Sequence, residues 1–253
     1  MIKLISKDWT IDNIDTVLFD KDGTFIDLHY FWGKMTELRS LKVIETFQLN
    51  PVNHSKLCDI LGYNIETKKM IPEGITALYS RVKIIEIFVN KLKDFNIYTT
   101  EKEITDIFDK VSIDFYSEIE KYTKPIENAI DFIKELRKNN IKIGVVTSDS
   151  VVSTELTIKN FNWESLFDVV IGRETSEYTK ESGIPTKIAL EALNSSSENT
   201  VMIGDAPMDY ISAKNAGIKN TILVSTGQIS SDKLKDTSPY VIESLKDLEC
   251  LKI

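Results

Sequence analysis

The sequence predicts an α/β protein with a parallel sheet, interrupted by an inserted helical domain. After Pro125, short and uniformly apolar runs alternate with helical patterns, which is typical of a parallel sheet covered by helices on both faces. One further apolar run, residues 15–19, lies far upstream, and long helical patterns separate it from the others. We therefore expect a Rossmann-like core made of residues 1–27 and 125–253, with an all-α domain of residues 28–124 inserted after the first strand.

The elements of the expected core follow one another in a regular order. The run at residues 15–19 ends at an acidic turn and predicts a buried strand. Further strands are expected over 141–147, 168–171, 200–204 and 220–224, with helices over 126–139, 151–161, 185–194 and 207–216.

The expected inserted domain carries two long amphipathic patterns. In residues 75–95 the apolar side chains recur at spacings of three and four, namely Leu78, Val82, Ile85, Val89 and Leu92. A second helix is expected over 100–122, where Thr100 precedes Glu103 at the spacing of a capping box. Both patterns are typical of the core of a helical bundle.

Composition and charge exclude several classes of protein. The 253 residues allow one or two domains at about 150 residues each. The net charge of −8 and the lack of basic clusters argue against a nucleic-acid partner. No stretch approaches the ~18 apolar residues of a membrane span, and no signal peptide pattern begins the chain. Cys58 and Cys250 form no CxxC motif, so we expect free thiols and a cytoplasmic protein with no membrane partner.

Polar residues gather where the expected strands end. In an open α/β sheet, ligands bind outside the carboxyl ends of the strands, so these residues should face one crevice. They are Asp20 and Asp22 after the first strand, Thr147 and Ser148 after the second, Lys180 after the third, and Asp205 and Asp209 after the fourth.

This set of residue types points to phosphate chemistry with a hard metal ion. Carboxylates gathered so closely repel one another unless a cation compensates them, and oxygen-only ligands favour Mg²⁺. The two acids Asp20 and Asp22 suggest divided roles, in which one attacks and the other exchanges protons. Any one of these residues alone is more often a helix cap or a turn former, so the prediction depends on their joint occurrence.

Four segments of the chain together resemble the motifs of the haloacid dehalogenase (HAD) superfamily. Residues 19–24, Phe-Asp-Lys-Asp-Gly-Thr, resemble its first motif, and the hydroxyl of Thr147 at a strand end resembles its second. Lys180 resembles the lysine of the third motif in the phosphoglycolate-phosphatase-like branch, and residues 204–209, Gly-Asp-x-x-x-Asp, resemble the fourth. The inserted helical domain resembles the cap of that branch, which excludes water and selects substrates.

The resemblance implies a role for each matching residue. Asp20 would be the nucleophile that forms an aspartyl-phosphate, and Asp22 would protonate the leaving oxygen and then activate water. Thr147 and Ser148 would bind the phosphoryl group, and Lys180 would neutralise charge on Asp20 and on the phosphate.

The resemblance also implies a magnesium site. Mg²⁺ would be held by the side chains of Asp20 and Asp205 and by the backbone carbonyl of Asp22. Asp209 would not bind the ion directly. It would contact a residue that does, or reach the ion through a water molecule.

The chain departs from the family pattern at two places. Glu181 replaces the usual proline after the lysine of the third motif, and Lys187 is a second candidate for that lysine. Ser148-Asp149 stands where many relatives have asparagine. Within the expected cap, His29, Arg39 and Arg81 are candidates for contact with substrate, although packing and solvated ion pairs are their more common uses.

The sequence therefore predicts an Mg²⁺-dependent phosphatase, monomeric or homodimeric, that hydrolyses a small soluble phosphomonoester. One alternative is a sugar phosphomutase of the same fold. Such relatives carry a His-containing element twelve residues after the nucleophile, where this chain has Trp32. A second alternative is a non-catalytic binding protein of the same fold, which would be expected to have lost one of the motif residues.

Overall fold

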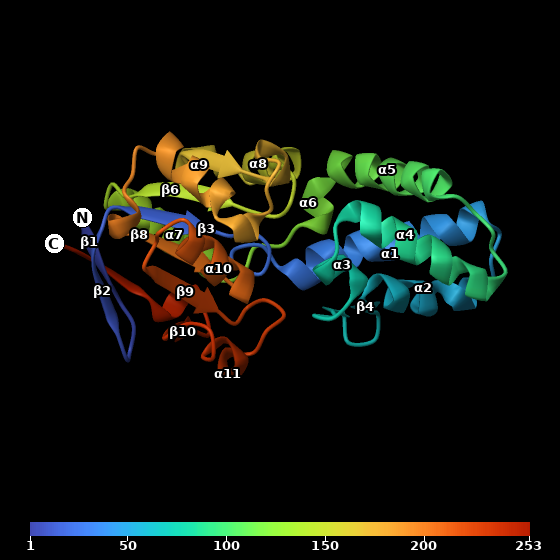
Figure 1. Ribbon diagram of the computed structural model, residues 1–253, viewed down its shortest axis with the longest axis horizontal. Coiled ribbons are helices and arrows are strands. Elements are labelled where there is room, and N and C mark those ends of the chain that lie inside the picture. Colours follow the sequence, from blue (N-terminus) through green and yellow to red (C-terminus); the bar gives the residue numbers. More distant parts are fainter. The chain divides into compact units, whose positions relative to one another are not determined.

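The computed structural model describes residues 1–253 and divides them into two compact units. The core unit consists of Met1–Asp27 and Lys124–Ile253, and the inserted unit is Leu28–Thr123 (Figure 1). At the boundary of the core unit the outgoing and returning segments are hydrogen-bonded to each other. The Asp27 amide donates to the Lys124 carbonyl at 2.8 Å, and the Ile126 amide donates to the Phe25 carbonyl at 3.0 Å.

The core unit is built on a six-stranded parallel sheet of order β10-β9-β8-β3-β6-β7. At its centre, Phe19 lies opposite both Val145 and Ile203, so three neighbouring strands end in line. The strands are β3 (Thr16–Phe19), β6 (Lys142–Val146), β7 (Val169–Ile171), β8 (Thr200–Gly204), β9 (Asn220–Val224) and β10 (Tyr240–Ile242).

Helices connect these strands and cover the sheet, which confirms the predicted Rossmann-like α/β class (Figure 1). The chain moves outward from β3 to β6 and β7, then returns to β8 and moves the other way. Right-handed crossovers therefore place the first two helices on one face and the last two on the other. These helices are α7 (Ala129–Lys138), α8 (Val151–Asn160), α9 (Ile184–Ala192) and α10 (Pro207–Asn215).

The packing agrees with this topology. Leu18 of β3 and Met202 of β8 lie in one buried cluster with Leu190 of α9 and Ala213 of α10. Every residue of β3 and β8 is buried, which explains why both read as uniformly apolar runs rather than as alternating ones.

A second, three-stranded antiparallel sheet joins the two ends of the chain, and the sequence analysis did not predict it. It has the order β11-β1-β2, with strands β1 (Ile2–Ile5), β2 (Thr10–Ile14) and β11 (Glu249–Lys252) (Figure 1). These strands are short and only partly buried, so they show no extended apolar run. A further short helix, α11 (Ser231–Leu234), precedes β10.

The inserted unit is helical except for one short antiparallel ladder between β4 (Tyr63–Asn64) and β5 (Lys69–Met70). The expectation of an all-α domain missed this ladder, which is only two residues long on each side. Its helices are α1 (Leu28–Thr46), α2 (His54–Leu61), α3 (Ile75–Leu78), α4 (Arg81–Leu92), α5 (Glu101–Ser117) and α6 (Ile119–Tyr122). No helix anywhere in the chain is long and apolar enough to cross a membrane.

The prediction of one helix over residues 75–95 was wrong. Tyr79 and Ser80 adopt extended backbone conformations, so α3 ends before them and α4 begins after them with a new phase. As a result Leu78 and Val82 are 58% and 73% exposed. The buried face of α4 is Ile84, Ile85, Phe88, Val89 and Leu92.

The capping box at the start of α5 is confirmed. The Glu103 amide donates to the Thr100 hydroxyl at 3.2 Å, and the Thr100 amide donates to the Glu103 carboxylate at 3.0 Å. Two donors that the helix itself cannot satisfy are thereby paired.

The candidate substrate contacts of this unit are engaged within it. His29 accepts a hydrogen bond at Nδ1 from the Met70 amide at 3.1 Å. The Arg81 guanidinium forms a partly exposed ion pair with Asp109 at 2.5 Å. Arg39 is buried, with its guanidinium 4.7 Å from the centre of the Phe108 ring.

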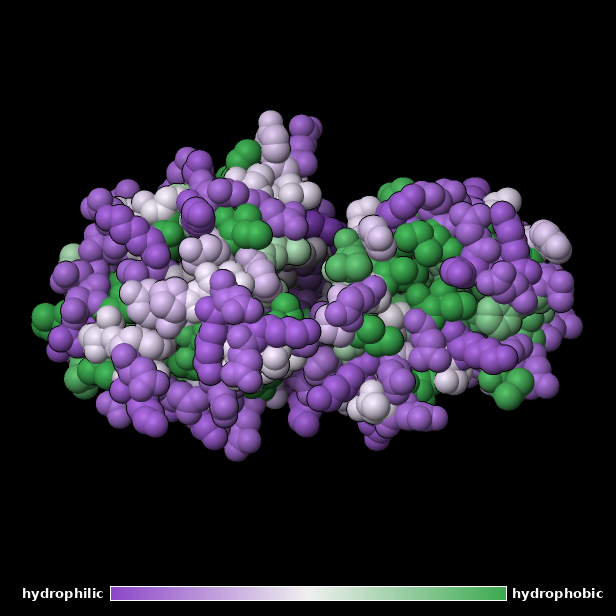
Figure 2. Space-filling model, turned by 60° about the horizontal axis from the view of Figure 1, so that its bottom comes forward, coloured by the Kyte–Doolittle hydropathy of each residue, from purple (hydrophilic) through white to green (hydrophobic).

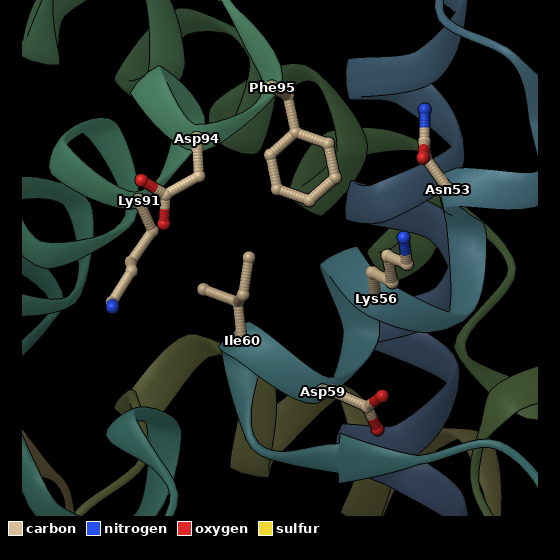
Figure 3. A pocket seen from close by; sticks show the side chains of 7 residues that line it. All are labelled: Asn53, Lys56, Asp59, Ile60, Lys91, Asp94 and Phe95. Atoms are coloured by element: carbon tan, nitrogen blue, oxygen red, sulfur yellow. The ribbon is translucent and has the colours of Figure 1, made fainter.

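The surface of the inserted unit is mixed in character. On the face shown in Figure 2, apolar side chains gather in one area of this unit. A shallow groove on the unit is lined by charges of both signs from α2, α4 and the adjoining turns (Figure 3). Its residues are Asn53, Lys56, Asp59, Ile60, Lys91, Asp94 and Phe95.

Because α4 buries Val89 and exposes Val82, replacing valine by alanine at these two positions should change the free energy of unfolding by different amounts. Val89→Ala removes two buried methyl groups and leaves a cavity, so it should lower the free energy of unfolding by about 1.5–3 kcal/mol. Val82→Ala, at an exposed position, should stay within about 0.5 kcal/mol of the wild type. Urea denaturation followed by circular dichroism measures both, and equal losses would contradict the assigned phase.

Candidate active site

The candidate residues meet at the point where the direction of the sheet's connections reverses. Asp20 directly follows β3, with Asp22 two residues further on, and Asp205 directly follows the neighbouring strand β8. The Asp20 amide donates to the Ile203 carbonyl at 2.8 Å, which continues the ladder one residue past β3. Crevices at such reversals are the usual ligand sites of open α/β sheets.

Lys180 reaches this cluster from the loop after β7. Its side chain is buried, and its ammonium lies 2.6 Å from an Asp20 oxygen and 2.5 Å from an Asp209 oxygen. The other lysine considered from the sequence, Lys187, is exposed on α9. The structure therefore brings Lys180, and not Lys187, to the carboxylates.

Asp209 is held by both of its carboxylate oxygens. Oδ1 accepts from Lys180, and Oδ2 accepts from the Ala206 amide at 3.0 Å at the start of α10. Gly204 is needed here, because a Cβ atom at that position would overlap the Asp209 carboxylate. These contacts hold Asp209 against Lys180, the residue that also contacts Asp20.

Asp205 is enclosed by two glycines. A Cβ atom on Gly23 or on Gly227 would overlap its carboxylate, and Gly23 also has a φ of +90°. The Thr226 hydroxyl donates to the Gly23 carbonyl at 2.6 Å, which ties the loop after β9 to the loop after β3. The sequence analysis missed this loop, residues 225–228; the signal that could have found it is a glycine turn directly after a predicted strand.

The loop after β6 carries Thr147 and Ser148. The Thr147 side chain is buried, and its hydroxyl accepts from the Asp149 amide at 3.1 Å. Ser148 is exposed, and its hydroxyl lies 3.5 Å from the Met208 sulfur. The two residues thus lie at the same end of the sheet as the carboxylate cluster.

A second buried lysine, which the sequence analysis did not consider, lies between the two acids of the first motif. Lys21 is fully buried, and its ammonium lies 2.5 Å from Asp149 Oδ2 and 3.2 Å from Asp22 Oδ1. Burial alone would raise the pKa of Asp149, but the Lys21 ammonium and the hydrogen bonds around it hold that pKa below its ordinary value.

The charges of the site are unevenly compensated. Lys180 bridges Asp20 and Asp209, and Lys21 bridges Asp22 and Asp149. Asp205 forms no ion pair with either lysine, and its burial together with Asp20 and Asp209 raises its pKa well above the ordinary range. Burial likewise raises the pKa of Asp20 to about 7, with Asp209 and Asp22 adding to the effect and Lys180 opposing it.

This cluster could bind a metal ion. Asp20, Asp205 and Asp209 are all buried, and each offers a carboxylate oxygen within 4.8 Å of the others. A cation between them would offset the burial and the mutual repulsion that raise the pKa values of Asp20 and Asp205. The donors are all oxygen, which favours a hard ion.

The chain belongs to the haloacid dehalogenase-like hydrolases, whose family pattern it matches over residues 14–217. It is 28% identical over 238 residues to the pyrophosphatase PpaX of Bacillus mycoides, covering 93% of this chain and 95% of that protein. The prediction of a HAD-type phosphatase is thereby confirmed at the level of the enzyme class.

Solved structures share the fold. A predicted phosphoglycolate phosphatase from Haemophilus somnus superposes with a TM-score of 0.71 at 13% identity, covering 94% of this chain and 97% of that one. A proposed β-phosphoglucomutase from Thermotoga maritima superposes with a TM-score of 0.68 at 16% identity, covering 92% and 96%. At these identities the likeness is evidence for the fold alone.

The enclosure of Asp205 predicts a strong effect of Gly227→Ala. The added Cβ must displace either the loop or the Asp205 carboxylate, so we expect turnover of p-nitrophenyl phosphate to fall by about 10²-fold. Gly217→Ala is the control: its φ of +87° makes the change strained, but no site residue adjoins it. It should lower thermal stability and spare turnover, and equal turnover in both variants would contradict the role of Gly227.

Proposed function

We propose that this protein is an Mg²⁺-dependent phosphatase that hydrolyses a small phosphorylated metabolite through an aspartyl-phosphate on Asp20. The observation that carries the proposal is the contact between Lys180 and Asp20 at 2.6 Å within a buried group of carboxylates. The ammonium orients a carboxylate and supplies positive charge where a phosphoryl group would lie. Phosphoryl transfer depends mainly on such positioning and charge stabilisation.

Mg²⁺ fits the residues that would hold it. The proposed ligands are carboxylate oxygens of Asp20 and Asp205 and the backbone carbonyl of Asp22, and all are hard oxygen donors. Asp205 is the carboxylate of this cluster that forms no ion pair with either lysine, and the glycines around it leave room beside its oxygens only because they lack side chains. When bound, the ion would neutralise negative charge on the phosphate and on the two aspartates.

The proposed reaction has two displacements at phosphorus. A carboxylate oxygen of Asp20 attacks and forms an O–P bond, while the bond to the leaving oxygen breaks and Asp22 gives that oxygen a proton. Asp22 then removes a proton from water, whose oxygen attacks the same phosphorus. The Asp20–phosphorus bond breaks, and inorganic phosphate and the free carboxylate are released.

The remaining residues would hold the phosphoryl group through both steps. Thr147 and Ser148 would donate hydrogen bonds from the loop after β6, and Lys180 would stabilise charge on the transferring oxygens. Asp209, whose two oxygens bind Lys180 and the Ala206 amide, would keep the lysine in place.

Inorganic pyrophosphate is a second candidate substrate. The relatives at 25–28% identity are named pyrophosphatases, and their similarity extends over 93% of this chain. Pyrophosphate and phosphomonoesters would use the same nucleophile. A panel of both, assayed for phosphate release with Mg²⁺ present, distinguishes them. A hexose 1-phosphate with a bisphosphate primer should release phosphate rather than yield an isomer; faster isomer formation would favour the mutase alternative.

Two isosteric variants separate the roles of the acids. Asp20→Asn removes the nucleophile, so no phosphoenzyme should form and turnover should fall to background. Asp22→Asn keeps the nucleophile and its own backbone carbonyl but removes the general acid and base. With p-nitrophenyl phosphate, whose leaving group needs little protonation, it should release one equivalent of phenolate and then stall, with the second step slowed about 10²–10⁴-fold.

Rapid-mixing spectroscopy followed by mass analysis of the quenched enzyme makes this measurement. Asp12→Asn changes an exposed aspartate outside the site and should behave as wild type. A burst from Asp20→Asn, or phosphate attached to any other residue, would contradict the proposed roles.

A further inference from the structure

We propose that Lys21 is a positioning residue that locks the phosphate-binding loop onto the nucleophile loop through Asp149. The proposal rests on the proposed function, because it assigns a purpose to the arrangement of Asp20, Asp22, Thr147 and Ser148. It concerns the chain between the two acids of the first motif, where a lysine side chain is fully buried.

Lys21 is anchored at both ends. Its backbone carbonyl accepts hydrogen bonds from the Phe25 and Ile26 amides, both at 3.1 Å, and so forms the turn that follows Asp20. Its ammonium leaves this turn and lies 2.5 Å from Asp149 and 3.2 Å from Asp22. Any movement of the ammonium therefore affects both the turn and the Asp22 carboxylate.

Asp149 organises the other loop. Its Oδ1 accepts from the Ser150 amide at 2.7 Å, and its own amide donates to the Thr147 hydroxyl at 3.1 Å. Its carbonyl accepts from the Arg173 amide at 3.0 Å. The conformation of the segment from Thr147 to Ser150 thus depends on where the Asp149 side chain and backbone are held.

The ion pair lies just beyond the end of the regular pairing between β3 and β6. The register of these strands ends with Phe19 opposite Val145. Lys21 follows β3 by two residues and Asp149 follows β6 by three, so their contact extends the connection between the strands into the site. A buried, hydrogen-bonded charge pair has narrow geometric tolerance, which suits it to fixing a distance between loops.

Asp149 also competes with Asp22 for the Lys21 ammonium. With Asp149 present, the Lys21 ammonium is shared between two carboxylates. If Asp149 is neutralised, the ammonium keeps Asp22 as its charged neighbour and should draw it from its working position. If both partners are replaced by neutral residues, the unpartnered ammonium that would draw Asp22 away is removed together with Asp149.

The test compares Lys21→Met, Asp149→Asn and the double variant. The matched control is the double variant Arg137→Met with Asp168→Asn, which removes an ion pair of 2.7 Å at the opposite end of β6. There Asp168 also accepts from the Ile143 amide at 2.8 Å, so the control likewise breaks a link between β6 and β7. For each protein we would measure kcat, KM, melting temperature and the affinity for inorganic phosphate with Mg²⁺ present.

Each single variant should lose about 10²-fold in kcat/KM at temperatures well below its melting temperature. Each should also bind inorganic phosphate about tenfold more weakly, as expected when a charge-assisted hydrogen bond is no longer well placed. The double variant should recover about tenfold in kcat/KM over Asp149→Asn, because the two changes are coupled. The control should lose stability and keep its kcat/KM and phosphate affinity.

Two results would overturn the proposal: single variants with lower melting temperatures but wild-type kcat/KM and phosphate affinity, or losses in the double variant equal to the product of the single losses. If one single variant does not fold, the other single variant and the double variant decide: wild-type kcat/KM and phosphate affinity in both would overturn the proposal. Phosphate affinity is measured without turnover. An inactive wild type would therefore contradict the proposed function, while the affinities still test Lys21.

Discussion

Repulsion among buried carboxylates at the carboxyl ends of β3 and β8 is the constraint on which the rest of the structure depends. Asp20, Asp22, Asp205 and Asp209 lie in this region, Asp149 follows the neighbouring strand β6, and all five are buried. Burial disfavours each charge and proximity adds repulsion, so the group could not stay ionised without compensation. Two buried lysines provide part of that compensation, and each bridges two carboxylates.

The fold supplies the geometry that this compensation requires. Parallel strands bring the ends of β3, β6 and β8 into line, so residues far apart in the chain become neighbours. Close approach of the backbone is then possible only where a side chain is missing, as at Gly23, Gly204 and Gly227. The proposed site therefore lies in a few short loops, while the helices mainly bury the sheet that carries them.

Local patterns in the sequence correctly predicted those features that residues close together in the chain determine. The uniformly apolar runs identified the central strands, and the Asp-x-Asp-Gly-Thr motif located the end of β3. The capping box at Thr100 also depends on residues close in sequence, and it was predicted correctly. Phase across a helix break was not predictable in this way, because the break at Tyr79 and Ser80 carries no proline or glycine.

Features that depend on residues far apart in the sequence were missed, because local patterns do not show which segments become neighbours in the fold. Lys21 and Asp149 are 128 positions apart, and their pairing follows only once β3 and β6 are known to be neighbours. The loop at Gly227 reaches Asp205 through the pairing of β8 with β9, which periodicity does not reveal. Lys180 was distinguished from Lys187 by the resemblance to known motifs, and the structure shows the physical difference in their burial.

The central claim is that Asp205 is the carboxylate left for a divalent cation to compensate. Titration calorimetry of Mg²⁺ into the wild type, Asp205→Asn and Asp232→Asn tests it most directly, since Asp232 is an exposed aspartate that pairs with Lys235. We expect one binding event in the wild type and in Asp232→Asn, and its loss in Asp205→Asn. Undiminished Mg²⁺ binding by Asp205→Asn would contradict it.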